Sequence, residues 1–104
     1  MARVKINIGT VLSSRGDYEE AITNFEDSIE LAGDAGDLRQ KGYALAGAAH
    51  VYIMNRETDI AMDYLEEALQ IFSSLGEQFK IALINLDYGR YYIQTNEKKK
   101  ALRS

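Results

Sequence analysis

The chain has 104 residues, which suits one compact domain and leaves no room for a second domain of ordinary size. Hydrophobic residues make up 46% and charged residues 27% of the sequence, values typical of a folded protein, so disorder is not expected. The net charge of -4 gives no general attraction to nucleic acid or to an anionic membrane. We therefore expect neither as a partner.

Composition also constrains fold class and location. Proline is absent, so no residue type in the chain forbids long helices, and an all-α fold is expected. Cysteine is absent too, which excludes disulfides and thiolate metal sites. No apolar run is long enough for a membrane span or a secretory signal, so we expect a cytoplasmic protein.

An internal repeat appears when the sequence is aligned with itself at an offset of 40 positions. In this alignment small residues fall on small ones and large apolar residues on large ones. The small positions that align are Gly9, Ala49 and Gly89, and Ala21, Ala61 and Ala101. Sorting by size in this way indicates three copies of one packing unit.

The first unit, about residues 2–37, is expected to form two helices. Apolar residues at helical spacing run to Leu12, and Gly16 is expected to end that helix in the left-handed conformation. Asp17 suits the N-cap of the second helix, with Glu20 as its capping-box partner. The second helix is expected to close in a loop over residues 33–37, which holds two glycines.

The second unit, about residues 38–77, repeats this plan. Its first helix is expected from about Leu38 to Asn55, followed by a turn near residues 56–58 and a second helix that ends within residues 73–77. The third unit, about residues 78–104, is incomplete: a helix from about 78 to 95, a turn at Asn96 and Glu97, and the start of a sixth helix. Close contacts between small residues, as between Gly9 and Ala21, are expected to hold each pair together.

This pattern resembles the tetratricopeptide repeat. The residues that carry the resemblance in the first two units are Gly9, Leu12, Gly16-Asp17-Tyr18, Ala21, Phe25 and Ser28, and then Ala49, Tyr52, Ala61, Leu65 and Ala68. The resemblance covers nearly the whole chain. It implies a right-handed superhelix of stacked antiparallel helix pairs, with about two and a half repeats, five helices and the start of a sixth. A period longer than the usual unit of about 34 residues is similar to the extended variant of the family.

The resemblance also implies a binding site, because the first helices of the units line a concave groove that binds a partner peptide or helix. The groove residues that it places in this sequence are Arg3, Asn7, Thr10, Tyr43, Gly47, His50, Met54, Leu83, Leu86, Asp87, Arg90 and Gln94. Basic residues outnumber acidic ones on these helices, so we expect a mildly basic groove and a partner with acidic residues.

Several other functions are excluded or left as alternatives. The sequence shows no nucleophile with a base, no paired carboxylates and no phosphate loop, so we expect a non-catalytic scaffold or adaptor without cofactor or metal. The carboxylate clamp of some family members is not expected, since its positions hold Ile6, Thr10, Gly47, Leu83 and Asp87. The alternative function is self-association, or a spacer role in a larger regulatory protein. The incomplete third unit predicts a piece of a longer array, or an open end that pairs with a second copy.

Overall fold

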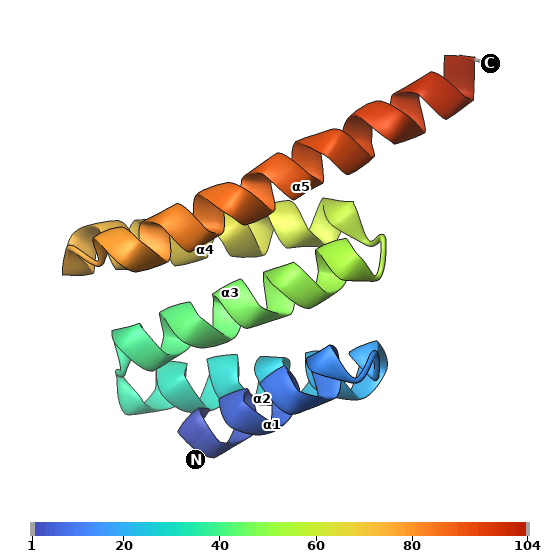
Figure 1. Cartoon of the computed structure of the whole chain (residues 1–104). Helices are drawn as coiled ribbons and strands as arrows, with labels where there is room; N and C mark the ends of the chain where they lie inside the picture. The colour runs from blue at the N-terminus through green and yellow to red at the C-terminus, as the bar shows by residue number, and fades with distance from the viewer. Residues whose placement is uncertain (1, 104) are drawn as a thin grey trace.

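A computed structural model of the chain describes the backbone of residues 2–103; the side chains of 78–80, 82, 83 and 97–103 lie outside the described set. This part of the chain forms five helices: α1 (Ala2–Ser14), α2 (Tyr18–Ala35), α3 (Leu38–Met54), α4 (Thr58–Leu75) and α5 (Gln78–Arg103). In Figure 1, α1, α3 and α5 form a front layer, with α2 and α4 behind them. The expected all-α fold of stacked helix pairs is confirmed.

The connections between helices are short because each contains one residue in the left-handed conformation. Gly16 adopts it with φ 84°, which confirms the predicted helix end. Arg56 occupies the equivalent position of the second repeat with φ 65°, a conformation that its side chain disfavours by roughly 1–2 kcal/mol. The following residue then returns its N–H to the preceding helix, as Asp17 does to the Leu12 carbonyl at 2.9 Å.

Two local predictions for α2 are wrong. The helix continues through the expected loop as far as Ala35, because Gly36 alone reverses the chain and its N–H caps the carbonyls of Ala32 and Gly33. The capping box at the start of α2 is not formed, since Asp17 makes no side-chain cap bond and its carboxylate lies 3.7 Å from Arg15. Helix α4, by contrast, ends at Leu75, within the residues 73–77 where its end was expected.

The predicted turn at Asn96 and the sixth helix are also wrong, because α5 continues without a break from Gln78 to Arg103. Bending at residue 96 would place an asparagine in the left-handed conformation that Gly16 and Arg56 adopt. In the second repeat, packing of the whole of α4 offsets that cost. The residues after Asn96 begin with four charged side chains, so they offer no comparable apolar face.

The ring of Phe25 holds the first three helices together. It reaches from α2 between Gly9 of α1 and Gly47 of α3, and only 2% of Phe25 is exposed. A Cβ atom built on Gly9 would lie 3.0 Å from the ring, and one on Gly47 would lie 2.4 Å from it. The atoms nearest to Gly9 therefore belong to an aromatic ring, whereas a small residue, Ala21, was expected there.

The equivalent small-residue contact of the third repeat is predicted between Gly89 and Ala101. Gly89 is exposed, and a Cβ atom built on it would meet nothing within 4 Å. Its expected partner Ala101 lies outside the described side chains. Gly89 is therefore on the exposed side of α5, whereas the equivalent Gly9 is buried.

We predict that Gly47→Ala destabilises the protein by about 1–3 kcal/mol, because the added methyl group would overlap the Phe25 ring, which Gly9 blocks on its other side. Urea denaturation followed by circular dichroism measures the change. Gly33→Ala is the matched control, since its Cβ atom would meet nothing within 4 Å inside a helix; its stability should be unchanged or higher by up to about 1 kcal/mol. Equal losses of stability in the two variants would contradict the close packing of the Phe25 ring against Gly47.

The carboxylate of Glu26 links the two complete repeats. The Tyr52 hydroxyl of α3 donates to Glu26 Oε1 of α2 at 2.6 Å, and the Tyr64 hydroxyl of α4 donates to the same oxygen at 3.3 Å. Burial, followed by the hydrogen bond to and the charge of Glu26, raises the pKa of Tyr52 well above its ordinary value of 10.0. The pKa of Tyr64 is raised for the same reasons.

This arrangement predicts a loss of stability at alkaline pH. The folded chain keeps the Tyr52 proton where the unfolded chain releases it, so the free energy of unfolding should be constant below pH about 10 and fall above it. Tyr52→Phe should make that fall shallower, although it also removes one hydrogen bond at neutral pH. Denaturation between pH 8 and 11 measures the slope, with the exposed Tyr92→Phe as control. An unchanged slope in Tyr52→Phe would refute the assignment.

Candidate protein-binding groove

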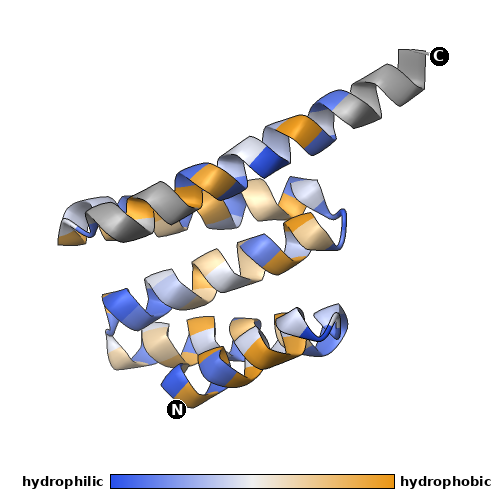
Figure 2. Cartoon of the chain, in the orientation of Figure 1, coloured by the Kyte–Doolittle hydropathy of each residue, from blue (hydrophilic) through white to orange (hydrophobic). Residues whose placement is uncertain are grey.

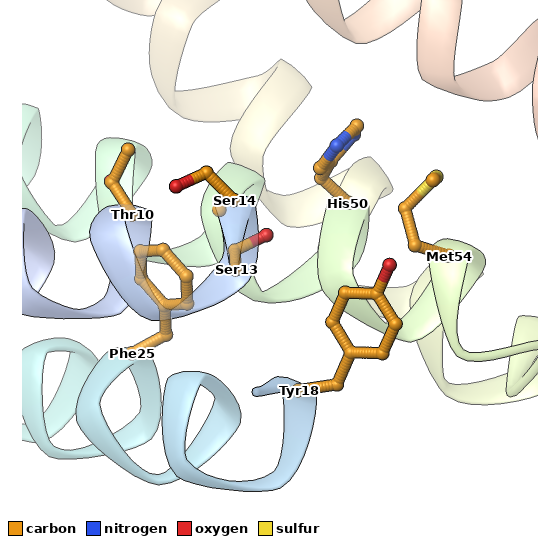
Figure 3. Close-up of a pocket in the computed structure, with 8 residues that line it drawn as sticks. Thr10, Ser13, Ser14, Tyr18, Phe25, His50 and Met54 are labelled. Atoms are coloured by element: carbon orange, nitrogen blue, oxygen red, sulfur yellow. The ribbon is translucent and has the colours of Figure 1, made fainter. Parts of the chain in front are cut away.

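A pocket of about 490 Å³ opens between α1 and α3 (Figure 3). Phe25 and Gly47, which pack closely on each other, contribute to its lining. The other lining residues are Thr10, Ser13 and Ser14 of α1, Tyr18 of α2, and His50 and Met54 of α3. Its volume lies within the range of roughly 300–1,000 Å³ that is usual for ligand sites. The pocket can therefore accept a large side chain from a bound segment.

The polar groups of the pocket differ in their availability. Thr10 and Ser14 donate their hydroxyl protons to carbonyls of their own helix, at 2.9 and 2.8 Å. The hydroxyls of Ser13 and Tyr18 have no hydrogen bond to any described part of the chain. These two hydroxyls are free to bond a ligand, beside an apolar floor.

A cluster of polar and charged side chains lies between α3 and α5. Asp87 Oδ1 lies 3.0 Å from His50 Nδ1 and accepts a hydrogen bond of 3.0 Å from Arg90 Nη1. The Asp87 side chain is only 12% exposed, whereas that of Arg90 is 51% exposed. Nearby, Gln94 Nε2 donates to the Ile53 carbonyl at the end of α3, at 2.9 Å. The cluster thus fixes α5 against α3 and leaves part of the Arg90 guanidinium in solvent.

Comparisons with known proteins identify the repeats. The family model described as Tetratricopeptide repeat matches residues 1–74, more than half of the chain. The chain belongs to the tetratricopeptide repeat family. A curated relative, the Photosystem I assembly protein Ycf3 of Prochlorococcus marinus, is 36% identical over 62 residues, or 60% of this chain and 34% of the relative. The chain spans about a third of that relative's length, and no solved structure matches it significantly.

The structure brings together only some of the groove residues that the tetratricopeptide resemblance placed. Thr10, Gly47, His50 and Met54 line the pocket, and His50 joins Asp87 and Arg90 in the charged cluster. Gln94 contacts the end of α3. Of the remaining predicted residues, Arg3, Asn7 and Leu86 are exposed and do not line this pocket, and the side chain of Leu83 lies outside the described set.

Tyr43 does not line this pocket; it is partly buried against the core, with its ring centroid 5.6 Å from that of Phe72. Sequence reasoning missed Phe25 and Tyr18 as pocket residues, since both come from the second helix of the repeat. The glycines at positions 9 and 47 carry the signal that was overlooked. A gap on each of two first helices admits a side chain from the helix behind them.

The basic residues of the first helices do not leave the groove as basic as expected. Lys5 pairs with Asp27 at 3.5 Å, and Lys41 with Glu67 at 3.8 Å, each between the two helices of one repeat. Arg39 pairs with Glu77, and Arg90 with Asp87. Acidic residues of neighbouring segments thus offset four of the charges on which the prediction rested.

In the part of the chain that the structure describes, no group of three histidine, cysteine or acidic side chains is arranged to hold a metal ion. None of its helices combines the length and the apolar character that a membrane crossing requires.

We predict that Asp87→Ala lowers the free energy of unfolding by about 1–2 kcal/mol, because it leaves two charged or polar partners, His50 and Arg90, without their acceptor. A double-mutant cycle of Asp87→Ala with Arg90→Ala should give a coupling energy that shrinks as salt is added. Asp63→Ala, an exposed acid on α4, is the control and should change stability little. A coupling energy of zero at low salt would show that the Asp87–Arg90 pair does not contribute to stability.

Proposed function

We propose that this tetratricopeptide protein is a non-catalytic adaptor that binds a segment of a partner protein in the groove formed by α1, α3 and α5. The pocket over Phe25 is the observation that supports this proposal most. It combines an aromatic floor with two unused hydroxyls, Ser13 and Tyr18, and so offers both an apolar anchor site and hydrogen-bond partners.

The chemistry of the pocket indicates what the partner segment carries. A large apolar side chain would fill the space above Phe25 and beside Met54, where burial of an apolar group stabilises a complex by about 1.5–3 kcal/mol. Backbone or side-chain groups next to that anchor would bond the free hydroxyls. The preference for acidic residues stays a prediction: the half-exposed Arg90 shares its charge with Asp87.

An assembly role agrees with the relative named above, whose printed name is that of an assembly protein. Family membership supports binding of protein partners rather than catalysis. We extend both properties to this chain as part of the proposal, together with the cytoplasmic location that its sequence predicts.

The proposal predicts that peptides selected on this protein bind through one apolar anchor. Phage display of random peptides on the wild-type chain, followed by fluorescence anisotropy of the selected sequences, identifies such peptides. Ser13→Trp should weaken their binding about tenfold or more, because the indole fills the pocket. Enrichment of acidic residues beside the anchor would support the acidic preference, and their absence would remove it.

Thr23→Trp is the matched control, because it adds the same side chain to an exposed position of α2, outside the pocket. It should leave peptide affinity unchanged. If Ser13→Trp and Thr23→Trp bind the selected peptides equally well, the pocket is not the binding site and the proposal fails.

Self-association is the second candidate function, and a different surface favours it. The side of α5 that faces away from the other helices carries Leu86 and Ile93, each 61% exposed. Large apolar side chains exposed to this degree on one helix face form a candidate contact surface.

A further inference from the structure

One side of α5 is exposed over its whole described length. The residues on this side, called here the α5 open face, are Asn85, Leu86, Gly89, Tyr92, Ile93 and Asn96. Leu86 and Ile93 are 61% exposed and Tyr92 is 56% exposed. Figure 2 shows apolar residues on α5 where it diverges from α4, and Figure 1 shows that this stretch rises away from the other helices.

Repeat register indicates what such a face normally contacts. The positions of α3 equivalent to residues 85, 89, 92 and 93 are Leu45, Ala49, Tyr52 and Ile53, all buried. Tyr52 packs there on Tyr64 of α4, with ring centroids 5.7 Å apart. In α1 the equivalent of Gly89 is Gly9, which lies against the Phe25 ring of α2. In both complete repeats this surface receives an antiparallel helix.

The α5 open face is also suited to meet a copy of itself. Helical geometry places Leu86 and Tyr92 on opposite sides of Gly89, and Asn85 and Ile93 likewise, each pair three or four positions from it. Two copies of α5 that cross antiparallel at Gly89 would therefore bring Leu86 of one copy beside Ile93 of the other. A glycine at the crossing lets the two backbones approach closely.

Charge favours a second copy over a charged partner. The α5 open face contains no aspartate, glutamate, lysine, arginine or histidine, while the whole chain carries a net charge of -4. Contact through this face thus brings no like charges together across the two-fold axis. The nearby Asp87 and Arg90 are paired with each other on the side of α5 that faces α3.

We propose that two copies of this chain associate through their α5 open faces, antiparallel and centred on Gly89, so that each α5 contacts the other copy where a second helix packs in the first two repeats. This proposal rests on the second candidate function and does not depend on peptide binding in the groove. The contact is isologous, so it closes at a dimer.

Cysteine cross-linking tests the centre of the contact. The chain has no cysteine, so Gly89→Cys introduces one thiol, and a Cβ atom at that position meets nothing in the monomer. A two-fold axis at Gly89 brings the two thiols within disulfide range, and a mild oxidant should give a covalent dimer rapidly. Gly33→Cys, equally unobstructed on α2, is the matched control and should stay monomeric. Equal cross-linking of both variants would overturn the proposal.

Sedimentation equilibrium tests the face as a whole. The wild-type mass should rise with concentration from 11.7 kDa to twice that value. Ile93→Glu should weaken association about tenfold or more by placing two carboxylates in the contact, with an unchanged helical spectrum. Val4→Glu is the control, because Val4 is 53% exposed on α1 at the other end of the stack. It should associate as the wild type does.

The other outcomes overturn the proposal. A constant mass of 11.7 kDa at every concentration would mean that this face does not bind a second copy. A mass that grows beyond the dimer, or that responds to Val4→Glu and not to Ile93→Glu, would indicate head-to-tail association through α1. Ser13→Trp separates the two proposals, because it should weaken peptide binding without changing the mass.

Discussion

The Phe25 ring, held between two glycines, is the contact on which both packing and binding depend. It links α2 to α1 and to α3, and so joins the first repeat to the second through one side chain. Because Gly47 has no side chain, the ring also reaches the surface of the groove and forms part of the pocket. The floor of the candidate site is therefore a core residue, with the rigidity that close packing gives.

Most of the charged side chains that the structure describes on α1, α3 and α5 are already paired. The ion pairs between α1 and α2 and between α3 and α4 are exposed, and pairs of this kind stabilise a fold by about 0–1 kcal/mol each. Their larger effect is on the surface field, since they reduce the free charge that a partner meets. Shape and apolar contact are left as the main sources of specificity in the pocket.

How much could be predicted from the sequence depended on the range of the interactions involved. Helical spacing of apolar residues and the glycine at position 16 are local signals, and they predicted the first four helices and the first turn. Arg56 shows the limit, because its left-handed conformation follows from the packing of the two helices beside it. The continuity of α5 also depends on more than the local sequence. Residues 97–100 are all charged, so a helix that began there would gain no apolar packing to offset the cost of a left-handed residue at the turn.

The candidate site was predictable only in part, for a related reason. The resemblance to the tetratricopeptide repeat placed Thr10, Gly47, His50 and Met54 in the groove, and these four residues line one pocket. It did not predict that Tyr43 packs partly against Phe72 or that Phe25 passes between the front helices. Both depend on which gaps remain once three helices have packed, which is a property of the assembled layer and not of any one segment.

The carboxylate of Glu26 has a further consequence, for the way in which the chain comes apart. One oxygen accepts hydroxyls from both helices of the next repeat, so melting of the first repeat would leave Tyr52 and Tyr64 without their shared acceptor. In a linear stack, a strong term between neighbours suppresses half-unfolded states. The two complete repeats should therefore behave as one cooperative unit, with fraying confined to the far end of the stack.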